Sequence, residues 1–382
     1  MKYLIISDCY YPSKKSISRH IYDLLKKFSN ENKNVDFYFP SQNKNKPILN
    51  QNYHLKNINY IPINTNDNKS DSFLIRGFSE FLMPFIFWNK IKKNKNKIKK
   101  IIIFSPSIFF GLIIKKLKIK FKCKVILIIR DIFPDWVLQK NKYLWFNPLF
   151  IFAKIISNFQ FYFSDVIAVQ SYKDKEIIKK KYMQKKIQVL YNWITPKKAP
   201  FRKKKSITNF VFAGTIGPAQ KWENIIYLIN QLNEKKIPFN FYFIGDGKYK
   251  SFLKKKLLIY KNFFFINSLP EQKFLKFLVK MDVGIISLDH KIKFNNIPGK
   301  FFSYLEANLP ILLDACHTQE ISKIIGNYKI GLTNKNSKNI LLYNSKKFIE
   351  KKFKYKDLKK NYSKVLRMKF STNLAFKKLL NF

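Results

Sequence analysis

The segment from Lys293 to Pro310 constrains the fold most, because it has the pattern of a short helix set between two apolar runs of strand type. Met281–Asp289 precedes this helix and Ile311–Leu313 follows it. A strand, a loop, a helix and a second strand in this order predict an α/β fold with a parallel sheet. Ligands of such sheets bind beyond the carboxyl ends of the strands, where this helix would begin.

The amino end of this helix has the chemistry of an anion site. Asn295 and Asn296 are preferred N-cap residues, and Pro298 is favoured at the first helical position. The first turn then offers N–H groups and a positive dipole end beside the Lys300 ammonium, which suits a phosphate. We expect the helix to end at Asn308–Pro310, since Asn tolerates a left-handed backbone and Pro cannot continue a helix. An ordinary surface helix explains the same residues.

Length and composition bound the classes of protein. A chain of 382 residues, of which 46% are hydrophobic, is long enough for two domains, each with its own core. The formal net charge of +51 draws the protein towards nucleotide phosphates, nucleic acid and anionic lipid. Heavy use of Lys, Asn, Ile, Phe and Tyr also follows from an AT-rich coding sequence, so coding bias explains part of this charge.

The cysteines and the apolar runs favour a cytoplasmic protein. Cys9, Cys123 and Cys316 lie far apart with no His spaced to help, so we expect no disulfide, no metal and a reducing compartment. The first residues turn polar too soon for a signal peptide. Polar residues break the apolar runs Ile101–Ile114 and Trp145–Phe163, so we expect a chain that can lie on a membrane without crossing it.

A first domain is expected over residues 1–195. It would hold an amphipathic helix at Arg19–Phe28 and a polar, loosely structured insertion at Ser41–Ser72. Its strands are predicted from six apolar runs: Tyr3–Ser7, Val35–Phe39, Ile101–Phe104, Val125–Ile129, Asp165–Val169 and Ile187–Asn192.

A linker of residues 196–206, rich in Lys and Pro, leads to a second domain of residues 207–365. Its first strands are predicted at Phe210–Ala213, Phe241–Ile244 and Phe263–Ile266, and the chain after Ile330 is predicted to be helical.

Candidate functional groups follow the apolar runs in both domains. Gly214 and Gly217 permit a strand-to-helix turn whose N–H groups can meet a diphosphate, and Gly245 opens a second tight turn. Arg130 and Asp131 directly follow a strand of the first domain, where α/β folds place functional groups. A structural Arg–Asp pair that only pins the loop is the alternative.

The stretch Phe73–Lys93 is dense in Phe, Leu, Ile and Trp and runs into the basic tract Lys90–Lys100. Aromatic and basic residues on an amphipathic segment can embed in the surface of an anionic bilayer. A buried helix followed by a solvated basic turn explains the stretch equally well. In either case we expect Pro84 to kink or interrupt the helix.

The helix at Lys293–Pro310 resembles the donor-binding helix of family 4 glycosyltransferases of the GT-B fold, whose pattern is Pro-Ser-Lys-x-Phe-Glu-Tyr-x-x-x-Gly-x-Pro. The residues that match it in register are Pro298, Lys300, Phe302, Tyr304 and Pro310. Four more segments match in the correct order. Three are similar to the WbuB-like subgroup that builds bacterial surface polysaccharides, Arg130–Asp135, Leu190–Ile194 and Ala213–Lys221, and Gly245–Gly247 is similar to the Gly-x-Gly of the whole family. The resemblance implies two Rossmann-like domains facing across a cleft, with a C-terminal helix of residues 366–382 crossing back to the first domain.

The first loop departs from the family pattern, which has glycines there for close approach of the backbone to the donor. The equivalent stretch Pro12–Ser18 has none, although Ser16 and Ser18 are small. Lys14 and Lys15 in this loop either contact phosphate or remain solvated.

The cations of the site also differ from the family. Thr215 and Gln220 stand where the family has an Arg and a Lys that contact the diphosphate, and Lys221 is adjacent. Which cation acts here is therefore open. Arg130 replaces a family His that touches the donor sugar, so the role of that His is not carried over unchanged.

The acidic motif of the family is altered too. Ser303 stands where the family has a Glu that binds ribose, and Asn295 stands at the other acid of the motif. Glu306 lies one helical turn after Ser303 on the same face. Either Ser303 and Asn295 bind hydroxyl groups, or Glu306 substitutes, or activity is reduced.

The resemblance implies a retaining, metal-independent glycosyltransferase without a cofactor, which moves a sugar from a nucleotide diphosphate, a UDP-sugar by expectation. The acceptor would be a lipid-linked saccharide or a polysaccharide at the inner face of the cytoplasmic membrane. Arg130 and Asp131 are the catalytic candidates. The expected donor-binding residues are Gly214, Thr215, Gly217, Gln220, Lys221, Gly245, Asn296, Pro298, Gly299, Lys300, Ser303 and Glu306.

Two other functions compete with this one. A basic nucleic-acid-binding protein is supported by the net charge and by the 17% aromatic residues, but the lysines are spread evenly and no recognition motif is present, so no specific nucleic acid is expected. A catalytically inactive scaffold of the same fold is motivated by Ser303.

Overall fold

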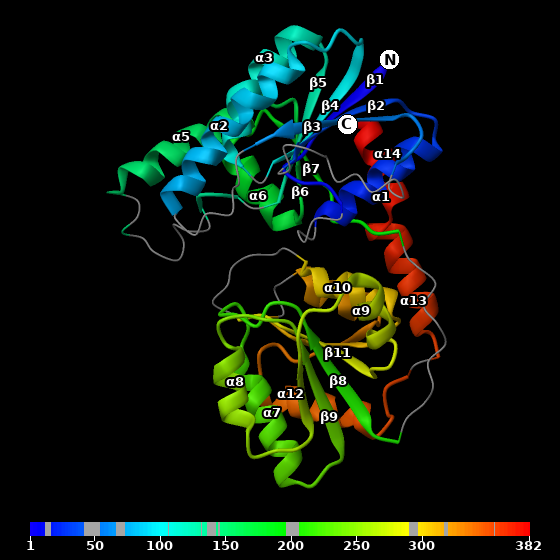
Figure 1. Ribbon diagram of the computed structural model, residues 1–382. Coiled ribbons are helices and arrows are strands. Elements are labelled where there is room, and N and C mark those ends of the chain that lie inside the picture. The colour runs from blue at the N-terminus through cyan, green and yellow to red at the C-terminus, as the bar shows by residue number, and fades with distance from the viewer. Residues whose placement is uncertain are drawn as a thin grey trace. The chain divides into compact units, whose positions relative to one another are not determined.

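The computed structural model describes residues 1–11, 17–41, 54–65, 73–105, 107–130, 132–135, 143, 146–195, 206–289, 297–316, 320–354 and 356–382. The chain divides into two compact units, one of Met1–Ile194 with Phe370–Phe382 and one of Thr195–Lys369. Each unit is a parallel sheet with helices packed on it (Figure 1), which confirms the predicted pair of Rossmann-like α/β domains.

The first unit is built on a seven-stranded sheet in the order β3-β2-β1-β4-β5-β6-β7. The strands are β1 (Lys2–Ile6), β2 (Val35–Ser41), β3 (Ile58–Asn64), β4 (Ile98–Ser105), β5 (Lys124–Ile129), β6 (Val166–Val169) and β7 (Lys186–Val189). The helices are α1 (Ile17–Asn30), α2 (Phe73–Ile91), η2 (Ile108–Phe110), α3 (Gly111–Phe121), α5 (Pro148–Phe163), α6 (Tyr172–Lys181) and α14 (Thr372–Asn381). The central strands are continuous apolar runs because helices cover both faces of a parallel sheet.

The predicted return of the C-terminal helix to the first unit is confirmed. In Figure 1 the red α14 lies against the blue α1, and the rings of Phe28 and Phe376 pack with their centroids 4.9 Å apart. Lys100 of β4 donates hydrogen bonds from Nζ to the carbonyl oxygens of Leu379 (3.1 Å) and Leu380 (2.8 Å). A cation at a helix C-terminus is favoured by the helix dipole. The tract Lys90–Lys100 was predicted to be a solvated basic turn. Its last residues belong instead to β4, and Lys100 is buried.

The expected loose insertion Ser41–Ser72 contains an ordered strand. β3 pairs in parallel with β2 from Ile58, opposite Val35, to Asn64. Pro62 lacks an N–H donor, and this is tolerated because β3 lies at the edge of the sheet. The prediction of a structureless insertion was wrong for these residues, and residues 42–53 and 66–72 lie outside the described part of the chain.

The helix predicted at Phe73–Lys93 is present as α2, and it continues through Pro84. Of the two predicted effects of Pro84, the interruption was wrong, since the helix loses one backbone hydrogen bond there and is held by packing on both sides of it, and the kink stays a prediction. Met83 and Phe87 are buried, whereas Phe78 and Ile86 are exposed. The helix thus has apolar side chains on its buried side and on its outer side.

The second unit is built on a six-stranded parallel sheet in the order β10-β9-β8-β11-β12-β13. The strands are β8 (Thr208–Ala213), β9 (Phe239–Ile244), β10 (Phe263–Ile266), β11 (Val283–Ser287), β12 (Ile311–Asp314) and β13 (Gly331–Thr333). The helices are α7 (Trp222–Glu234), α8 (Lys250–Leu257), α9 (Glu271–Leu278), α10 (Gly299–Glu306), α11 (Glu320–Asn327), α12 (Lys338–Ile349), α13 (Leu358–Val365) and η4 (Leu366–Phe370). The short strand β13 was missed within a region predicted to be helical.

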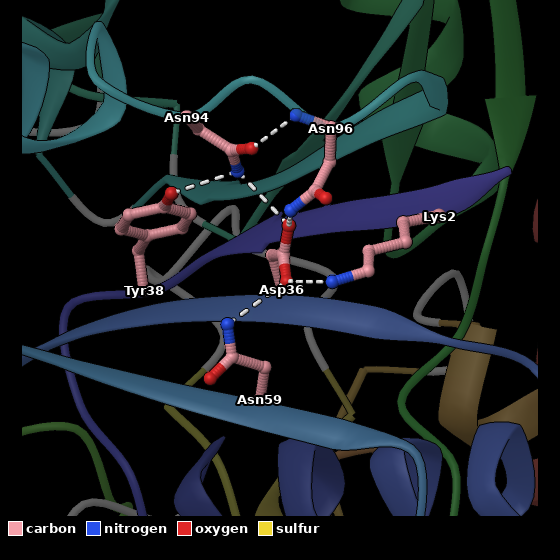
Figure 2. A network of polar contacts seen from close by, with 6 residues as sticks. All are labelled: Lys2, Asp36, Tyr38, Asn59, Asn94 and Asn96. Atoms are coloured by element: carbon pink, nitrogen blue, oxygen red, sulfur yellow. Dashed lines mark hydrogen bonds and ion pairs between the residues drawn. The ribbon is translucent and has the colours of Figure 1, made fainter.

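A buried carboxylate ties the amino ends of the strands of the first unit together (Figure 2). Asp36 of β2 accepts hydrogen bonds from Lys2 (3.2 Å), Asn59 (3.1 Å), Asn94 (2.9 Å) and Asn96 (2.8 Å). Burial by itself would raise the pKa of Asp36, but the hydrogen bonds from these groups outweigh it and hold the pKa below its ordinary value. One carboxylate thus joins β1, β2, β3 and the turn before β4.

We predict that Asp36→Asn lowers the free energy of unfolding by about 2–4 kcal/mol, because the amide cannot accept four donors. Urea denaturation at neutral pH measures this loss. A carboxylate with a lowered pKa stabilises the fold above the pKa of the unfolded chain, so the gap between parent and variant should close as the pH falls below about 4. The surface variant Glu350→Gln should leave stability nearly unchanged, and equal losses in both variants would contradict the account.

Candidate functional site

The order of the strands reverses between β8 and β11 in the second unit, and ligands of open α/β sheets bind at this kind of switch point. The chain leaving β8 forms the loop from Gly214 to Lys221, and α10 follows β11. The two segments therefore meet at the carboxyl end of the sheet. Most of the predicted donor-binding residues belong to them.

The side chain of Tyr304 fixes α10 across the ends of β8 and β11. Its hydroxyl accepts a hydrogen bond from the Ala213 N–H (3.0 Å) and lies 3.1 Å from the carbonyl oxygens of Val211 and Ile285, to which it can donate. A side chain at Gly284 would collide with the ring, since a Cβ there would lie 2.5 Å from its Cδ2. Glycine at this position is therefore what lets the ring reach the sheet.

The amino end of α10 begins one residue later than predicted. Gly299 is its first residue and Pro298 takes the N-cap position, so no side chain caps the first turn. The Phe301 N–H donates to the Pro298 carbonyl oxygen at 2.9 Å, which leaves the N–H groups of Gly299 and Lys300 ahead of the helical ladder. This is the arrangement that binds anions. Asn295 and Asn296 lie outside the described residues.

The predicted carboxyl end of α10 is confirmed. Asn308 has a left-handed backbone with φ 53°. Its N–H donates to the Leu305 carbonyl oxygen (3.2 Å), and the Leu309 N–H donates to the Tyr304 carbonyl oxygen (2.9 Å). These two bonds form a Schellman motif, which satisfies the last carbonyl groups before Pro310.

Lys300 lies at the switch point, beside the turn after β8. Its Nζ lies 3.4 Å from the centroid of the Phe212 ring, and a Cβ at Gly214 would lie 3.5 Å from its Cε. Burial lowers the pKa of Lys300 to about 7. A poorly solvated ammonium gains more from a bound anion than a surface lysine does.

The loop after β8 is held against the turn after β9 by two backbone hydrogen bonds. The Gly214 N–H donates to Ile244 (2.8 Å) and the Ile216 N–H donates to Asp246 (2.9 Å). A Cβ at Gly245 would lie 2.2 Å from the Gly214 oxygen, and both glycines have positive φ, 110° at Gly214 and 132° at Gly245. Only glycine permits this close approach of the two turns.

The second half of the same loop forms hydrogen bonds within itself. The Gly217 N–H donates to Gln220 Oε1 at 3.0 Å, and the Trp222 indole donates to the Gly217 carbonyl oxygen at 2.6 Å. In this conformation Gln220 braces the loop, and the Gly217 N–H that we expected to meet a diphosphate is engaged. Thr215 lies between Gly214 and Ile216, whose N–H groups both donate to the turn after β9.

A buried carboxylate that was not among the predicted residues supports this loop. Asp314 at the end of β12 accepts hydrogen bonds from Asn224 (3.1 Å), Asn334 (2.8 Å), Asn336 (3.1 Å) and Ser287 (3.2 Å). Burial raises the pKa of Asp314 although these hydrogen bonds oppose the rise. An acid directly after an apolar run was a signal that could have found it.

Ser287 links Asp314 to the loop by hydrogen bonds. Its hydroxyl donates to Asp314 and accepts a hydrogen bond from the Lys221 N–H at 3.0 Å. Lys221 is the N-cap residue of α7, so the chain of hydrogen bonds fixes the position of a second helix amino end. Asp314 therefore acts on the site through Ser287, without lying in it.

The remaining predicted donor residues lie on α10. Ser303 is half-buried, and Glu306, one turn further along the helix, is buried. The structure thus brings Lys300 of α10 and the turns at Gly214 and Gly245 together at the carboxyl end of the second sheet. Asn296 of the same set lies outside the described residues, as do the first-domain candidates Asp131, Lys14, Lys15 and Ser16.

Arg130 follows β5 in the first unit and lies near a buried histidine that the sequence did not single out. The ring of His20 hydrogen-bonds through Nδ1 to the Trp193 carbonyl oxygen, and the Trp193 indole donates to the His20 carbonyl oxygen at 2.7 Å. Burial lowers the pKa of His20 to about 4 against the hydrogen bond to Trp193, and the charge of Arg130 lowers it further. The imidazole is therefore neutral at physiological pH.

A hollow of about 660 Å³ lies beside the Asp36 network, at the edge of the first sheet that β3 forms. It opens at the amino ends of the strands, where α/β folds do not place their sites. Its lining residues are Tyr38, Asn59, Tyr60, Ile61, Pro62, Lys90, Lys93, Asn94, Lys95 and Asn96.

Comparison with known proteins supports a glycosyltransferase. The chain is 25% identical over 279 residues to the probable glycosyltransferase WbjE of Pseudomonas aeruginosa, and the match covers 68% of each chain. No protein-family model matches the chain.

Two solved structures superpose on nearly the whole chain. WaaG, a glycosyltransferase involved in lipopolysaccharide biosynthesis, has a TM-score of 0.69 at 13% identity and covers 99% of this chain and 98% of its own. TarM of S. aureus, solved as a mutant in complex with fondaparinux, α-GlcNAc-glycerol and UDP, has a TM-score of 0.67 at 12% identity, with 100% and 99% covered. These likenesses and the strand order show the GT-B fold.

We predict that Gly284→Ala lowers the free energy of unfolding by about 2–3 kcal/mol, because the new methyl group collides with the rigid Tyr304 ring. Thermal or urea denaturation measures the loss. Gly326→Ala in α11 is the matched control, since no heavy atom lies within 4 Å of its new Cβ and a helical alanine adds up to about 1 kcal/mol. Equal effects in the two variants would contradict the proposed role of Tyr304.

Proposed function

We propose that the protein is a retaining, metal-independent glycosyltransferase of bacterial surface-polysaccharide synthesis, which uses a nucleotide-diphosphate sugar, in the first place a UDP-sugar. The observation that carries this proposal is the desolvated Lys300 ammonium beside the Gly214 turn, at the switch point of the second sheet. The similarity to WbjE and the GT-B fold support the reaction class. The UDP in the TarM structure supports the choice of nucleotide.

The leaving diphosphate would lie between the amino end of α10 and the turns at Gly214 and Gly245. As the bond from the sugar to the diphosphate breaks, negative charge grows on the leaving oxygen. Lys300, the first N–H groups of α10 and Lys221 at the amino end of α7 would stabilise this charge. Because these groups are already fixed by Tyr304, Ser287 and the paired turns, little reorganisation is needed during the reaction.

The ribose of the donor would meet the half-buried Ser303, with Glu306 one turn behind it. Ser303 is shorter than the glutamate of the family pattern. A water molecule would therefore bridge the Ser303 hydroxyl and the ribose. Pro298, Gly299 and Asn296 would line the same side of the nucleotide, and Thr215 and Gln220 would shape the diphosphate turn.

The first unit would bind the acceptor, a lipid-linked saccharide or a growing polysaccharide at the cytoplasmic face of the membrane. Asp131 would orient the acceptor hydroxyl or take its proton, and Arg130 would assist beside it. No carboxylate nucleophile is proposed, since the retaining reaction would proceed on one face of the sugar with the leaving phosphate assisting deprotonation. The fold shared with WaaG, a glycosyltransferase involved in lipopolysaccharide biosynthesis, supports a place in surface-polysaccharide synthesis.

We predict that UDP binds with proton uptake. With Lys300 at a pKa of about 7 in the protein alone, the amine is largely neutral at pH 8.5, and a bound diphosphate must restore its proton. Titration calorimetry in buffers of different ionisation enthalpy should show uptake of about one proton per nucleotide at pH 8.5. Affinity should fall by up to about tenfold per pH unit above pH 8.

The matched variants are Lys300→Ala and the surface control Lys338→Ala, which remove the same charge. Lys300→Ala should weaken UDP binding by about tenfold to a hundredfold and abolish the proton uptake, whereas Lys338→Ala should change neither. UDP, GDP and ADP are compared in the same way. Failure of all three to bind, with salt-sensitive binding of random RNA instead, would overturn the proposal. Tight binding of UDP without turnover of any UDP-sugar would favour an inactive scaffold.

A further inference from the structure

The outer face of α5 is a continuous apolar stripe. Its large apolar side chains recur every three or four residues and are 38–65% exposed. They are Leu149, Phe152, Ile155, Phe159 and Tyr162. At 1.5 Å per residue the stripe is about 20 Å long. Exposed apolar surface of this extent on a compact unit marks an interaction site.

The opposite face of α5 is fixed to the first unit, so the stripe cannot turn inward. Gly111 of α3 lies so close to α5 that a Cβ there would be 2.6 Å from the Gln160 nitrogen. Ile156, Ser157 and Phe161 are buried on this inner face. The stripe is therefore the outer surface of a helix whose rotation is set by its packing on α3.

The helix α2 lies at the same flank of the unit as α5 (Figure 1). It carries a second set of exposed apolar residues at helical spacing: Phe78, Phe85 and Ile86. Both α2 and α5 pack against η2, which keeps the two helices together. The sequence pointed to Phe73–Lys93 alone, and the structure adds the longer stripe of α5 to it.

Lysines lie beside the carboxyl end of the stripe and beside α2. Lys115 of α3 lies 5.8 Å from the centre of the Phe163 ring, and Lys185 lies 5.4 Å from the centre of the Tyr162 ring. Lys116 lies 5.9 Å from the centre of the Trp88 ring of α2. Over α2, α3 and α5 the sequence has one acid, Glu80, against seven basic residues. The apolar surface thus has a strongly positive rim.

This chemistry selects one partner. We propose that the outer faces of α5 and α2 dock on an anionic lipid bilayer, with the aromatic and aliphatic side chains in the interface and the lysines on the headgroups. A second copy of the chain fits poorly, because it carries the same net charge of +51 and the same positive rim. Within the described residues no helix is long and apolar enough to span a membrane, so the contact would be one of surface docking.

The proposal extends the proposed function, since a membrane-bound protein would meet a lipid-linked acceptor at the surface. It depends on the first unit alone. A failure to bind any nucleotide would overturn the transferase proposal and leave membrane docking intact. A failure to bind vesicles would overturn membrane docking and leave the transferase proposal intact.

Co-sedimentation of the full chain with vesicles tests the docking. The vesicles are phosphatidylcholine alone and phosphatidylcholine mixed with phosphatidylglycerol. We expect binding to the mixed vesicles that weakens with salt, and little binding to the neutral ones. The double variant Phe152→Ser with Phe159→Ser should bind the mixed vesicles roughly tenfold or more weakly.

The matched control is Phe252→Ser with Tyr343→Ser, which removes two exposed aromatic rings from α8 and α12 of the second unit. It should bind as the parent does. A charge variant, Lys115→Gln with Lys116→Gln, should weaken binding to the mixed vesicles and reduce its salt dependence, and it leaves the α5 stripe intact. The circular dichroism spectrum and the melting temperature of each variant, compared with the parent, verify that the fold is intact.

Two results would overturn the proposal. One is equal vesicle binding by the parent, the α5 variant and the charge variant. The other is a dimer of the parent in sedimentation velocity that the α5 substitutions dissociate while vesicle binding is unchanged, which would assign the stripe to a second copy.

Discussion

The hydroxyl of Tyr304 is the contact on which the site depends. It bonds to β8 and lies within hydrogen-bond distance of β11, and it can do so because Gly284 leaves room for the ring. This fixes α10 across the switch point, and one turn earlier on the helix Lys300 then lies over the Phe212 ring. The position of the cation therefore follows from a tyrosine that binds the sheet. A small shift of α10 would move the Lys300 ammonium away from the Gly214 turn.

The chain uses its few acids as internal anchors in a very basic protein. Asp36 and Asp314 are both fully buried and each accepts four hydrogen bonds, one at the amino ends of the first sheet and one at the carboxyl ends of the second. Two lysines with little contact to water differ in their partners: Lys100 is buried and Lys300 is half-buried. Lys100 is satisfied by carbonyl groups at the end of α14, whereas Lys300 faces an aromatic ring. The poorer solvation of Lys300 is what makes it a candidate for binding an anion.

Much of the fold could be predicted from the sequence because parallel strands are continuous apolar runs, and the left-handed Asn308 was predicted from its place before Leu309 and Pro310. β3 and β13 were missed because one is partly polar and contains Pro62 and the other has three residues. His20 acts through contacts between distant segments, which no local pattern reveals, whereas Asp314 directly follows an apolar run and could have been singled out. The stripe on α5 could not be predicted either, since the sequence of Trp145–Phe163 does not show which face packs on α3.

The central claim is that a nucleotide diphosphate binds between the Gly214 turn and the amino end of α10. Hydrogen exchange of the backbone, followed by mass spectrometry with and without UDP, tests it most directly. The account predicts slower exchange in peptides that cover residues 214–222 and 297–306, with little change around the Asp36 network. Protection confined to the hollow lined by Lys90 and Lys93, or to no segment of the second unit, would contradict it.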